Sequence, residues 1–504
     1  MQRFVWGSLI GVALLGCGED DADPQPTGSG GSASTSSGSA SGGSGATTGS
    51  GGDGTTFRIA SPADGSDVYG SANLVIEVIG LEPDWVEFVA AGASEPFCLD
   101  KAPSFSCLHD LSLEAPGSTH GVEARAVVDN QVVATDSIEL VKVSPEAPIC
   151  KDGDGNDVPI TDCLAALQGE ALAAGNVGDF YDNLDGDHTT LNTANHPDVA
   201  YLHTAYGTQS IGSVPEHQDP GDALIGNASL CSTVGSECYG QLRWQISVGR
   251  ANTLSQLYHQ NKLFWFPEHT DHDDVDRADY MVPFTNNSQG SSGSEMDEVE
   301  KFLWTMAALS PDTKAAAITS GTLMPAVNMI FRRTRVASDT EYLSGKAHAN
   351  AFDNVPNDWT MVRWAHLLGP SDVPPVAELS VIEEDWDMQT GEIGFTTPVS
   401  IQRKWKGNIQ ATRHMVVEAA AMGASAGATL SYHWRVLRGN PDAVRIIQDA
   451  PDDSRVQIEI DHHTEETVEV DGVPRLTKLV VVGAFVHDGR SLSAPSFVTS
   501  YAEL

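Results

Sequence analysis

Basic residues are scarce in this chain of 504 residues, where 28 Lys and Arg stand against 69 Asp and Glu and the formal net charge is -41. A surface of that sign repels phosphate backbones and anionic lipid headgroups. Nucleic acid is therefore excluded as a partner, and so is electrostatic adhesion to a membrane. Such a surface attracts divalent cations instead.

Long apolar runs are absent after Leu15, so the sequence holds no second candidate for a membrane span. Arg3 and the short apolar run over residues 4–15 are typical of a signal peptide. The run ends Leu-Leu-Gly-Cys at Cys17, which resembles the lipobox of bacterial lipoproteins; an ordinary secretory signal with a chance cysteine is the alternative. The resemblance implies a lipid on Cys17, and Gly18 after it favours the outer membrane or cell surface.

Residues 18–55 contain almost no apolar side chains and consist mainly of Gly, Ser, Thr and acidic residues. A segment of this kind cannot offset the entropy of ordering, so we expect a tether. As a flexible coil it would span roughly 35 Å.

Short strands are expected over residues 57–61, 73–80, 85–91, 121–129 and 132–143, with a hairpin turn at Asn130 and Gln131. Regularly spaced short strands without a helical pattern indicate a β-sandwich. The opening residues 60–68 and the strand after them resemble bacterial Ig-like modules. We expect this module to act as a spacer.

The middle of the chain mixes helical and strand patterns. Helices are expected over residues 161–175, 249–260 and 295–309, and strands over 262–266, 280–284 and 326–331. The third helix carries one apolar stripe, formed by Val299, Phe302, Leu303, Met306 and Leu309. This succession predicts an α/β or α+β domain.

β-Structure returns after residue 376, with strands expected over 377–385, 413–421, 430–439, 454–463, 478–489 and 495–504. Asp488 and Gly489 form a turn signal between two apolar runs. The pattern around Trp434 resembles a PKD or related Ig-like sandwich, in which this tryptophan would lie in the core.

The predicted fold is therefore multidomain, with two Ig/PKD-like β-sandwiches flanking a central α/β or α+β domain. The predicted boundaries are 1–17 for the signal peptide and lipobox, 18–55 for the tether, 56–143 for the first sandwich, 144–375 for the central domain and 376–504 for the second sandwich. Residues 178–504 also resemble a family of large secreted proteins of environmental bacteria. That family implies no reaction.

Six cysteines remain when Cys17 is assigned to the lipid, and an even number suits an oxidising compartment. None shows the C-x-x-C spacing of a redox or zinc site. Six cysteines allow fifteen pairings, and their spacing favours three local disulfides: Cys98 with Cys107, Cys150 with Cys163, and Cys231 with Cys238.

Residues 268–274 hold the densest cluster of acidic and imidazole side chains, directly after a predicted strand. Mixed nitrogen and oxygen ligands suit zinc or another transition metal better than calcium. The candidate catalytic and metal-binding residues of this loop are Glu268, His269, Asp271, His272 and Asp273. The alternative is a solvated acidic loop with hydrogen-bonded histidines.

Residues 286–294 form a second polar loop, rich in Ser, Gly and Asn, between a predicted strand and a helix. Ser291 or Ser292 would be a nucleophile with His269 or His272 as its base. The loop matches neither a P-loop nor a G-x-S-x-G elbow, and local capping of the helix by Ser294 is the alternative. The two loops share one cleft if their strands are parallel neighbours, whereas a hairpin would separate them.

Four further residues are candidates for binding substrate. Arg332 and Arg333 stand out in so acidic a chain and would bind a carboxylate or sulfate, unless they pair internally with Asp or Glu. Lys346 and His348 would belong to the same surface. Loose calcium sites are considered at residues 152–157 and 182–187, although an EF-hand is rejected because its key positions do not match.

Two functions remain open. The first is a surface-anchored extracellular hydrolase, metal-assisted through zinc or calcium, that acts on a glycan, ester or protein. The second is a cell-surface binding or adhesion protein without catalysis. Clustered acid, imidazole and serine side chains favour the first, and the lack of a complete catalytic motif favours the second.

Overall fold

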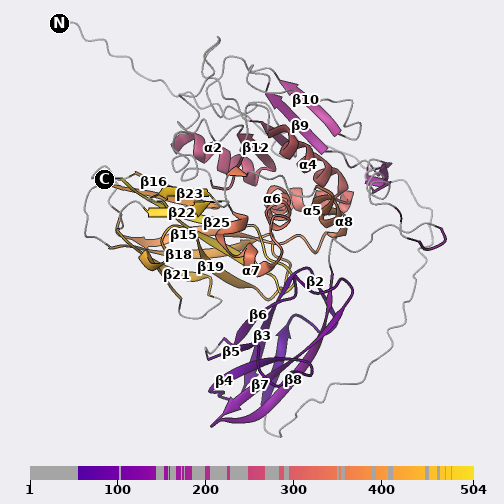
Figure 1. The fold of residues 1–504 in the computed structure, drawn as a ribbon, viewed down its shortest axis with the longest axis vertical. Coiled ribbons are helices and arrows are strands. Elements are labelled where there is room, and N and C mark those ends of the chain that lie inside the picture. The colour runs from indigo at the N-terminus through magenta and orange to yellow at the C-terminus, as the bar shows by residue number, and fades with distance from the viewer. Residues whose placement is uncertain are drawn as a thin grey trace, which may run out of the picture. The chain divides into compact units, whose positions relative to one another are not determined.

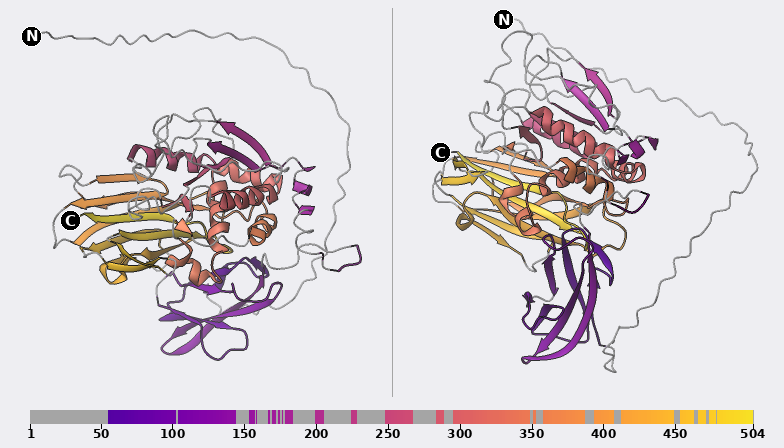
Figure 2. Two further views of the ribbon diagram at one scale, coloured as in Figure 1. Left: turned by 45° about the horizontal axis from the view of Figure 1, so that its top comes forward. Right: turned by 45° about the vertical axis from the view of Figure 1, so that its right-hand side comes forward.

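The computed structural model describes part of the chain, and Figures 1 and 2 show its elements. The described residues are 55–101, 104–143, 153–156, 158, 166–167, 169–171, 173–174, 176, 178–183, 199–204, 224–227, 248–266, 283–288, 295–348, 351–352, 358–386, 393–406, 412–448, 453–462, 466–470, 473–477 and 479–503. All of them belong to one compact unit, Thr47–Leu504.

The first part of the described chain is made of strands alone. A three-stranded sheet has the order β1-β3-β6 and a five-stranded sheet the order β2-β8-β7-β4-β5. The strands are β1 (Thr56–Ser61), β2 (Ser66–Val68), β3 (Ser71–Ile79), β4 (Trp85–Ala90), β5 (Cys98–Asp100), β6 (Ser106–Asp110), β7 (Thr119–Val128) and β8 (Gln131–Lys142). Both sheets contribute apolar side chains to one core, among them Leu74, Phe88 and Val122.

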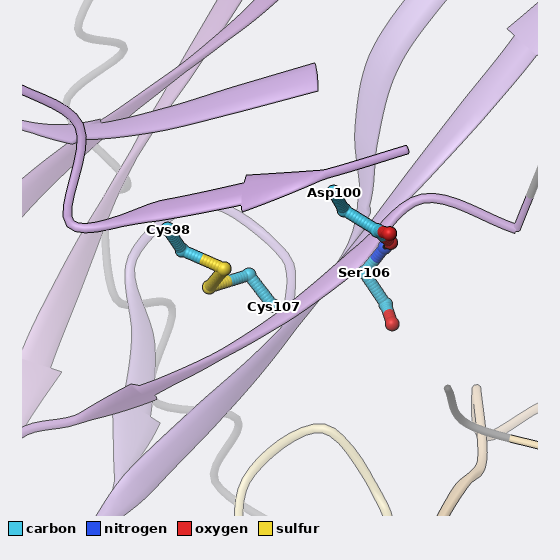
Figure 3. Close-up of a disulfide and its surroundings, with 4 residues drawn as sticks. All are labelled: Cys98, Asp100, Ser106 and Cys107. Carbon is cyan, nitrogen blue, oxygen red and sulfur yellow. A yellow bond between two sulfur atoms is a disulfide. The ribbon is translucent and has the colours of Figure 1, made fainter. Parts of the chain in front are cut away.

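The predicted disulfide between Cys98 and Cys107 is present (Figure 3). It joins β5 of one sheet to β6 of the other. The Asp100 carboxylate accepts a hydrogen bond of 2.8 Å from the Ser106 amide beside it. The other four cysteines, Cys150, Cys163, Cys231 and Cys238, lie outside the described residues.

The turn between β7 and β8 lies one residue earlier than expected. Asp129 and Asn130 have φ angles of 50° and 63°, and Gln131 already begins β8. Two positive φ angles match the twist of a two-residue hairpin loop, for which Asp and Asn are suited. The side chain of Asn130 made the turn recognisable, but not its register.

The central sheet is parallel throughout and has the order β10-β9-β11-β12-β13-β14. Its strands are β9 (Gly178–Asn183), β10 (Val199–Thr204), β11 (Leu224–Asn227), β12 (Lys262–Phe266), β13 (Asn286–Ser288) and β14 (Ala351–Phe352). A parallel sheet accompanied by helices is the α/β alternative of the prediction.

Helices accompany this sheet. They are α2 (Val248–His259), α4 (Glu295–Ala308), α5 (Pro311–Ser320), α6 (Leu323–Arg333), α7 (Asp339–Tyr342) and α8 (Asp358–Leu367), with a 3-10 turn η3 (Gly345–Ala347). Helix α4 lies alongside strands β9 and β10 (Figures 1 and 2). The apolar stripe predicted for α4 is confirmed, since its five residues are all buried.

The strand predicted over residues 326–331 is wrong, because these residues belong to α6. Every residue of α6 is buried. Within the predicted window, residues 326–331, only Asn328 is polar, and an apolar run this short cannot be told from a buried strand by its periodicity. Of the strand predicted over 280–284, Pro283 and Phe284 lie in a turn before β13, and residues 280–282 lie outside the described residues.

The C-terminal part returns to β-structure. Its sheets have the orders β15-β18-β21-β20 and β16-β17-β25-β24-β19, with a separate pair β22-β23. The elements are β15 (Val376–Glu384), β16 (Ile393–Thr397), β17 (Ser400–Lys406), β18 (Thr412–Met422), β19 (Ser431–Arg438), η5 (Pro441–Ala443), β20 (Val444–Ile447), β21 (Arg455–Asp461), β22 (Glu466–Val470), β23 (Val473–Thr477), β24 (Leu479–His487) and β25 (Ser496–Glu503). Trp434 is buried in the core they form, as predicted.

Strand β24 is buried at all nine positions. Val480, Val482 and Val486 belong to the core of the C-terminal sheets. Leu479 and Phe485, which point the other way, belong to the core that also contains helices α4 and α6. Since side chains alternate along a strand, this one strand connects two hydrophobic cores.

Replacing both Cys98 and Cys107 with Ala should lower the free energy of unfolding by about 2–3 kcal/mol, because a short loop would no longer be closed in the unfolded chain. Urea denaturation of the chain from residue 56 measures this. If the double variant unfolds at the same midpoint as the unchanged chain, this disulfide contributes nothing to stability.

Candidate functional site

The carboxyl ends of the parallel strands mark one edge of the central sheet. Strand β9 lies between β10 and β11, so the chain extends the sheet first to one side of β9 and then to the other. In open α/β sheets, ligands bind outside the carboxyl ends near such a reversal. The strand ends nearest to it are Asn183 of β9 and Asn227 of β11.

The two polar loops predicted as a site follow neighbouring strands of this sheet. β12 and β13 pair in parallel, with Trp265 opposite Asn286 and Phe266 opposite Asn287. The chain therefore leaves both strands at the same edge. A hairpin was considered because the strand predicted over residues 280–284 left a short connection after β12. Since β13 begins only at Asn286, residues 267–285 connect the two strands, and they provide the dozen or more residues that a parallel crossover needs.

The candidate side chains of these loops, Glu268, His269, Asp271, His272, Asp273, Ser291 and Ser292, lie outside the described residues. Their convergence stays a prediction. The described ranges contain no group of three or more His, Cys, Asp or Glu placed to hold a metal ion. Of the predicted calcium segment 182–187, only the backbone of Asp182 and Asn183 is described, at the end of β9.

A buried guanidinium supports the start of β13. Arg332 on α6 has no exposed surface. Its Nη2 donates to the carbonyl oxygens of Pro283 and Thr285 and to Oδ1 of Asn286, at 3.3 to 3.4 Å. Its Nε donates to Oδ1 of Asn328 at 3.2 Å. These bonds fix the segment that enters β13, and with it the strand from which the serine-rich loop leaves.

Asn328 extends the same network. Its amide nitrogen donates to the Phe284 carbonyl at 3.0 Å and to the Tyr258 hydroxyl at 3.5 Å, and Asn286 donates to Asn328 Oδ1 at 3.2 Å. Burial raises the pKa of Tyr258 to about 12. The hydrogen-bond partners of Arg332 among the described residues are thus neutral groups.

Arg333 points into a different buried cluster. Its guanidinium pairs with Asp339, whose side chain is 1% exposed, and lies 5.1 Å from the ring of Trp364 and 5.6 Å from that of Tyr342. Arg333 thus pairs internally with an acidic residue, which was the alternative to a role in binding substrate.

Lys346 and His348 do not share a surface. Lys346 is exposed and pairs with Glu341 at 2.6 Å, and its hydrogen bond lowers the pKa of that carboxyl group. His348 is buried, bonds through Nε2 to the Tyr342 carbonyl, and lies 5.2 Å from the ring of Phe485. Burial, and then the charge of Arg332, hold the pKa of His348 well below its usual range. The four candidate binding residues are thus not brought together.

One signal of the buried network is present in the sequence and was missed. Asn328 interrupts an otherwise apolar run, and a polar residue in such a run needs a hydrogen-bonding partner once it is buried. Its partners, Tyr258 and Asn286, come from distant parts of the chain. Nothing in their local patterns indicates that they meet.

Replacing Arg332 with Met should lower the free energy of unfolding by about 3 kcal/mol, because several buried acceptors lose their donor. Hydrogen exchange should accelerate first at the amides of residues 285–288. The matched control is Lys346→Ala, an exposed cation, which should leave both measurements nearly unchanged. Uniform protection across β12 and β13 in Arg332→Met would contradict the supporting role.

Comparisons with known proteins show no family. No protein-family model matches the chain, and no curated protein matches it. Among solved structures, the chain is similar to a nucleoside hydrolase-related hypothetical protein from Saccharophagus degradans that is associated with carbohydrate metabolism, at 11% identity and a TM-score of 0.24, covering 68% of this chain and 97% of that one. It is also similar to a beta-glucosidase from Listeria innocua, at 11% identity and a TM-score of 0.12, covering 66% and 50%. At these TM-scores neither similarity identifies a fold or an activity.

Proposed function

We propose that this protein is a lipid-anchored extracytoplasmic hydrolase whose site lies at the carboxyl edge of the central parallel sheet. The observation that carries the proposal is the parallel pairing of β12 with β13. It brings the beginnings of two polar loops to one edge, where open α/β sheets bind their ligands. A binding protein has no need for acids, imidazoles and serines gathered at one such edge.

The loop chemistry suits hydrolysis. His269, His272, Asp271 and Asp273 supply the nitrogen and oxygen ligands that zinc prefers, and Glu268 would act as general base on a water molecule. Without a metal, Ser291 or Ser292 would attack the substrate with a histidine as base. The substrate class is an extracellular glycan, ester or protein, since the acidic surface disfavours nucleic acid.

The flanking modules would hold or space the hydrolase. In this proposal, residues 56–143 form an Ig-like β-sandwich and residues 376–504 a PKD/Ig-like one. In each part, two sheets contribute to a single core, which is the arrangement of a sandwich.

Anchoring is proposed through Cys17, with residues 18–55 as the tether. None of the helices in the described ranges combines the length and apolar character that a bilayer crossing requires. A diacylglyceryl group together with an amide-linked acyl chain gives stable attachment, since each buried methylene contributes about 0.8 kcal/mol.

Replacing Cys17 with Ser should abolish incorporation of labelled fatty acid and move the protein from the membrane fraction to the soluble fraction of a bacterial host. Cys98→Ala/Cys107→Ala is the control and should stay in the membrane fraction. Undiminished lipid labelling of the Cys17→Ser protein would refute the anchor.

Replacing His269 and His272 with Ala should remove a bound transition metal from the purified chain beginning at residue 56. If the metal is catalytic, hydrolysis of nitrophenyl esters or glycosides should fall about 100-fold or more. Elemental analysis and initial rates measure these effects. His414→Ala, in β18, is the matched control and should change neither.

The outcomes separate the mechanisms. If the purified protein holds no metal and its hydrolysis is lost in Ser291→Ala/Ser292→Ala, the mechanism uses a serine nucleophile in place of a metal. A protein that holds no transition metal and hydrolyses none of these substrates would overturn the hydrolase and leave a surface binding role.

A further inference from the structure

The connection between β2 and β3 is inserted into the rest of the chain. Tyr69 is 5% exposed and belongs to the core that contains α4, α6 and β24. Its hydroxyl donates to Asp372 at 3.1 Å, and its ring lies 5.6 Å from that of Trp364. The 56–143 module therefore places one of its side chains in a core that is not its own.

The next two residues extend this contact. A Cβ atom on Gly70 would lie 1.7 Å from Nη2 of Arg333 and 2.5 Å from Asp339, so a side chain here would displace this buried ion pair. The amide of Ser71 donates to the buried Asp339 carboxylate at 2.6 Å. Backbone of the module thus donates a hydrogen bond to the Arg333–Asp339 pair.

His487, at the end of β24, holds the other side of Ser71. Its Nδ1 accepts from the Gly489 amide at 2.9 Å, and its Nε2 lies 3.0 Å from the Ser71 carbonyl oxygen. Because Nδ1 accepts, the proton belongs on Nε2, which donates to Ser71. A second proton would place an N–H against the Gly489 N–H, so this arrangement requires the neutral ring.

On balance, the surroundings of His487 disfavour its protonated form. Burial lowers its pKa, and Arg333 acts in the same direction, whereas Asp488, Asp339 and the Ser71 carbonyl act against them. The ring of His433 lies 6.2 Å away, and a charge on either imidazole lowers the pKa of the other. Separation of the module would expose Nε2 to water and remove much of the energetic cost of protonating His487.

A second titratable contact lies at the start of α7. The Asp110 carboxylate of the module accepts from the amide of Thr340 at 2.9 Å and from its hydroxyl at 2.8 Å. Burial acts to raise the pKa of Asp110, but hydrogen bonds from Ser112 and Thr340 outweigh it and lower the pKa. This contact therefore requires the ionised carboxylate.

The two groups have the same sign of pH dependence. A histidine whose pKa is lowered by docking weakens docking as the pH falls below its ordinary value of 6.5. A carboxylate whose pKa is lowered by docking weakens it as the pH falls below its ordinary value of 3.8. Docking is therefore strongest near neutral pH, and His487 titrates first.

We propose that the 56–143 module is held on the rest of the chain by an acid-sensitive junction, formed by Tyr69, Ser71 and Asp110 on the module and by Asp339, Thr340, Asp372 and His487 on its partner surface. The junction is closed while His487 is neutral. Acid opens it, and the module keeps its own core and disulfide when it leaves.

The test uses the complete chain from residue 56 with a protease site introduced within residues 144–150. After cleavage, sedimentation measures the association of the two parts between pH 8 and pH 5. We expect a stable complex at neutral pH and a dissociation constant that rises up to tenfold per pH unit below about 6.5. Near-ultraviolet circular dichroism of each part should be retained where they separate.

His487→Gln is the decisive variant, because a glutamine amide donates and accepts as the neutral imidazole does but does not titrate. Its complex should keep a constant affinity down to pH 5. His414→Gln, which replaces a half-buried histidine in β18 outside the junction, is the matched control and should behave as the unchanged chain does.

Three results would overturn the junction: separation of the parts at neutral pH, equal pH dependence with and without His487, or loss of tertiary structure before separation. If the parts of the His487→Gln protein do not associate at neutral pH, the pH profile of association of the unchanged chain is the deciding measurement. A slope of about one proton between pH 6.5 and pH 5 supports the proposal, and a flat profile refutes it.

Discussion

Burial of β24 on both faces is the interaction on which the rest of the structure depends. An ordinary antiparallel strand has one apolar and one polar face, but the residues of β24 are buried on both. One face packs within the C-terminal sheets and the other against the helices of the central part. The central sheet is thereby attached to the C-terminal sheets through apolar contact, and His487 at the end of β24 contributes a polar contact to the first module.

Much of the fold could be predicted from local patterns. Alternating strands such as β7 and the apolar stripe of α4 were recognisable because each presents one face to a core. The failures come from segments without a solvent-facing side. α6 is buried all round, and its central run, residues 326–331, is too short and too apolar to show a helical period. A strand was predicted over residues 280–284, whereas β13 is Asn286–Ser288, and this difference left the direction of the central strands undecided.

The candidate site could be predicted only in part. The two polar loops are visible in the sequence, but the parallel neighbours that bring them to one edge become visible only through pairing. Arg332 and Arg333 stand out as rare cations in an acidic chain, yet adjacent positions on α6 direct them to two separate buried clusters. The contact between His487 and Ser71 joins residues 416 positions apart, and no local pattern encodes it.

The double burial of β24 also bears on how the strand finds its alignment during folding. In most strands a slip of one residue moves the apolar side chains into water, and that cost selects the correct pairing. A slip of β24 would exchange one apolar face for another. Alignment must then come from particular shapes: Gly483 leaves room for Leu437, because a Cβ there would lie 2.5 Å from Leu437 Cδ1, and His487 fits only where Gly489 and Ser71 meet it. A single small residue and a single imidazole thus carry the specificity that hydrophobic patterning supplies elsewhere.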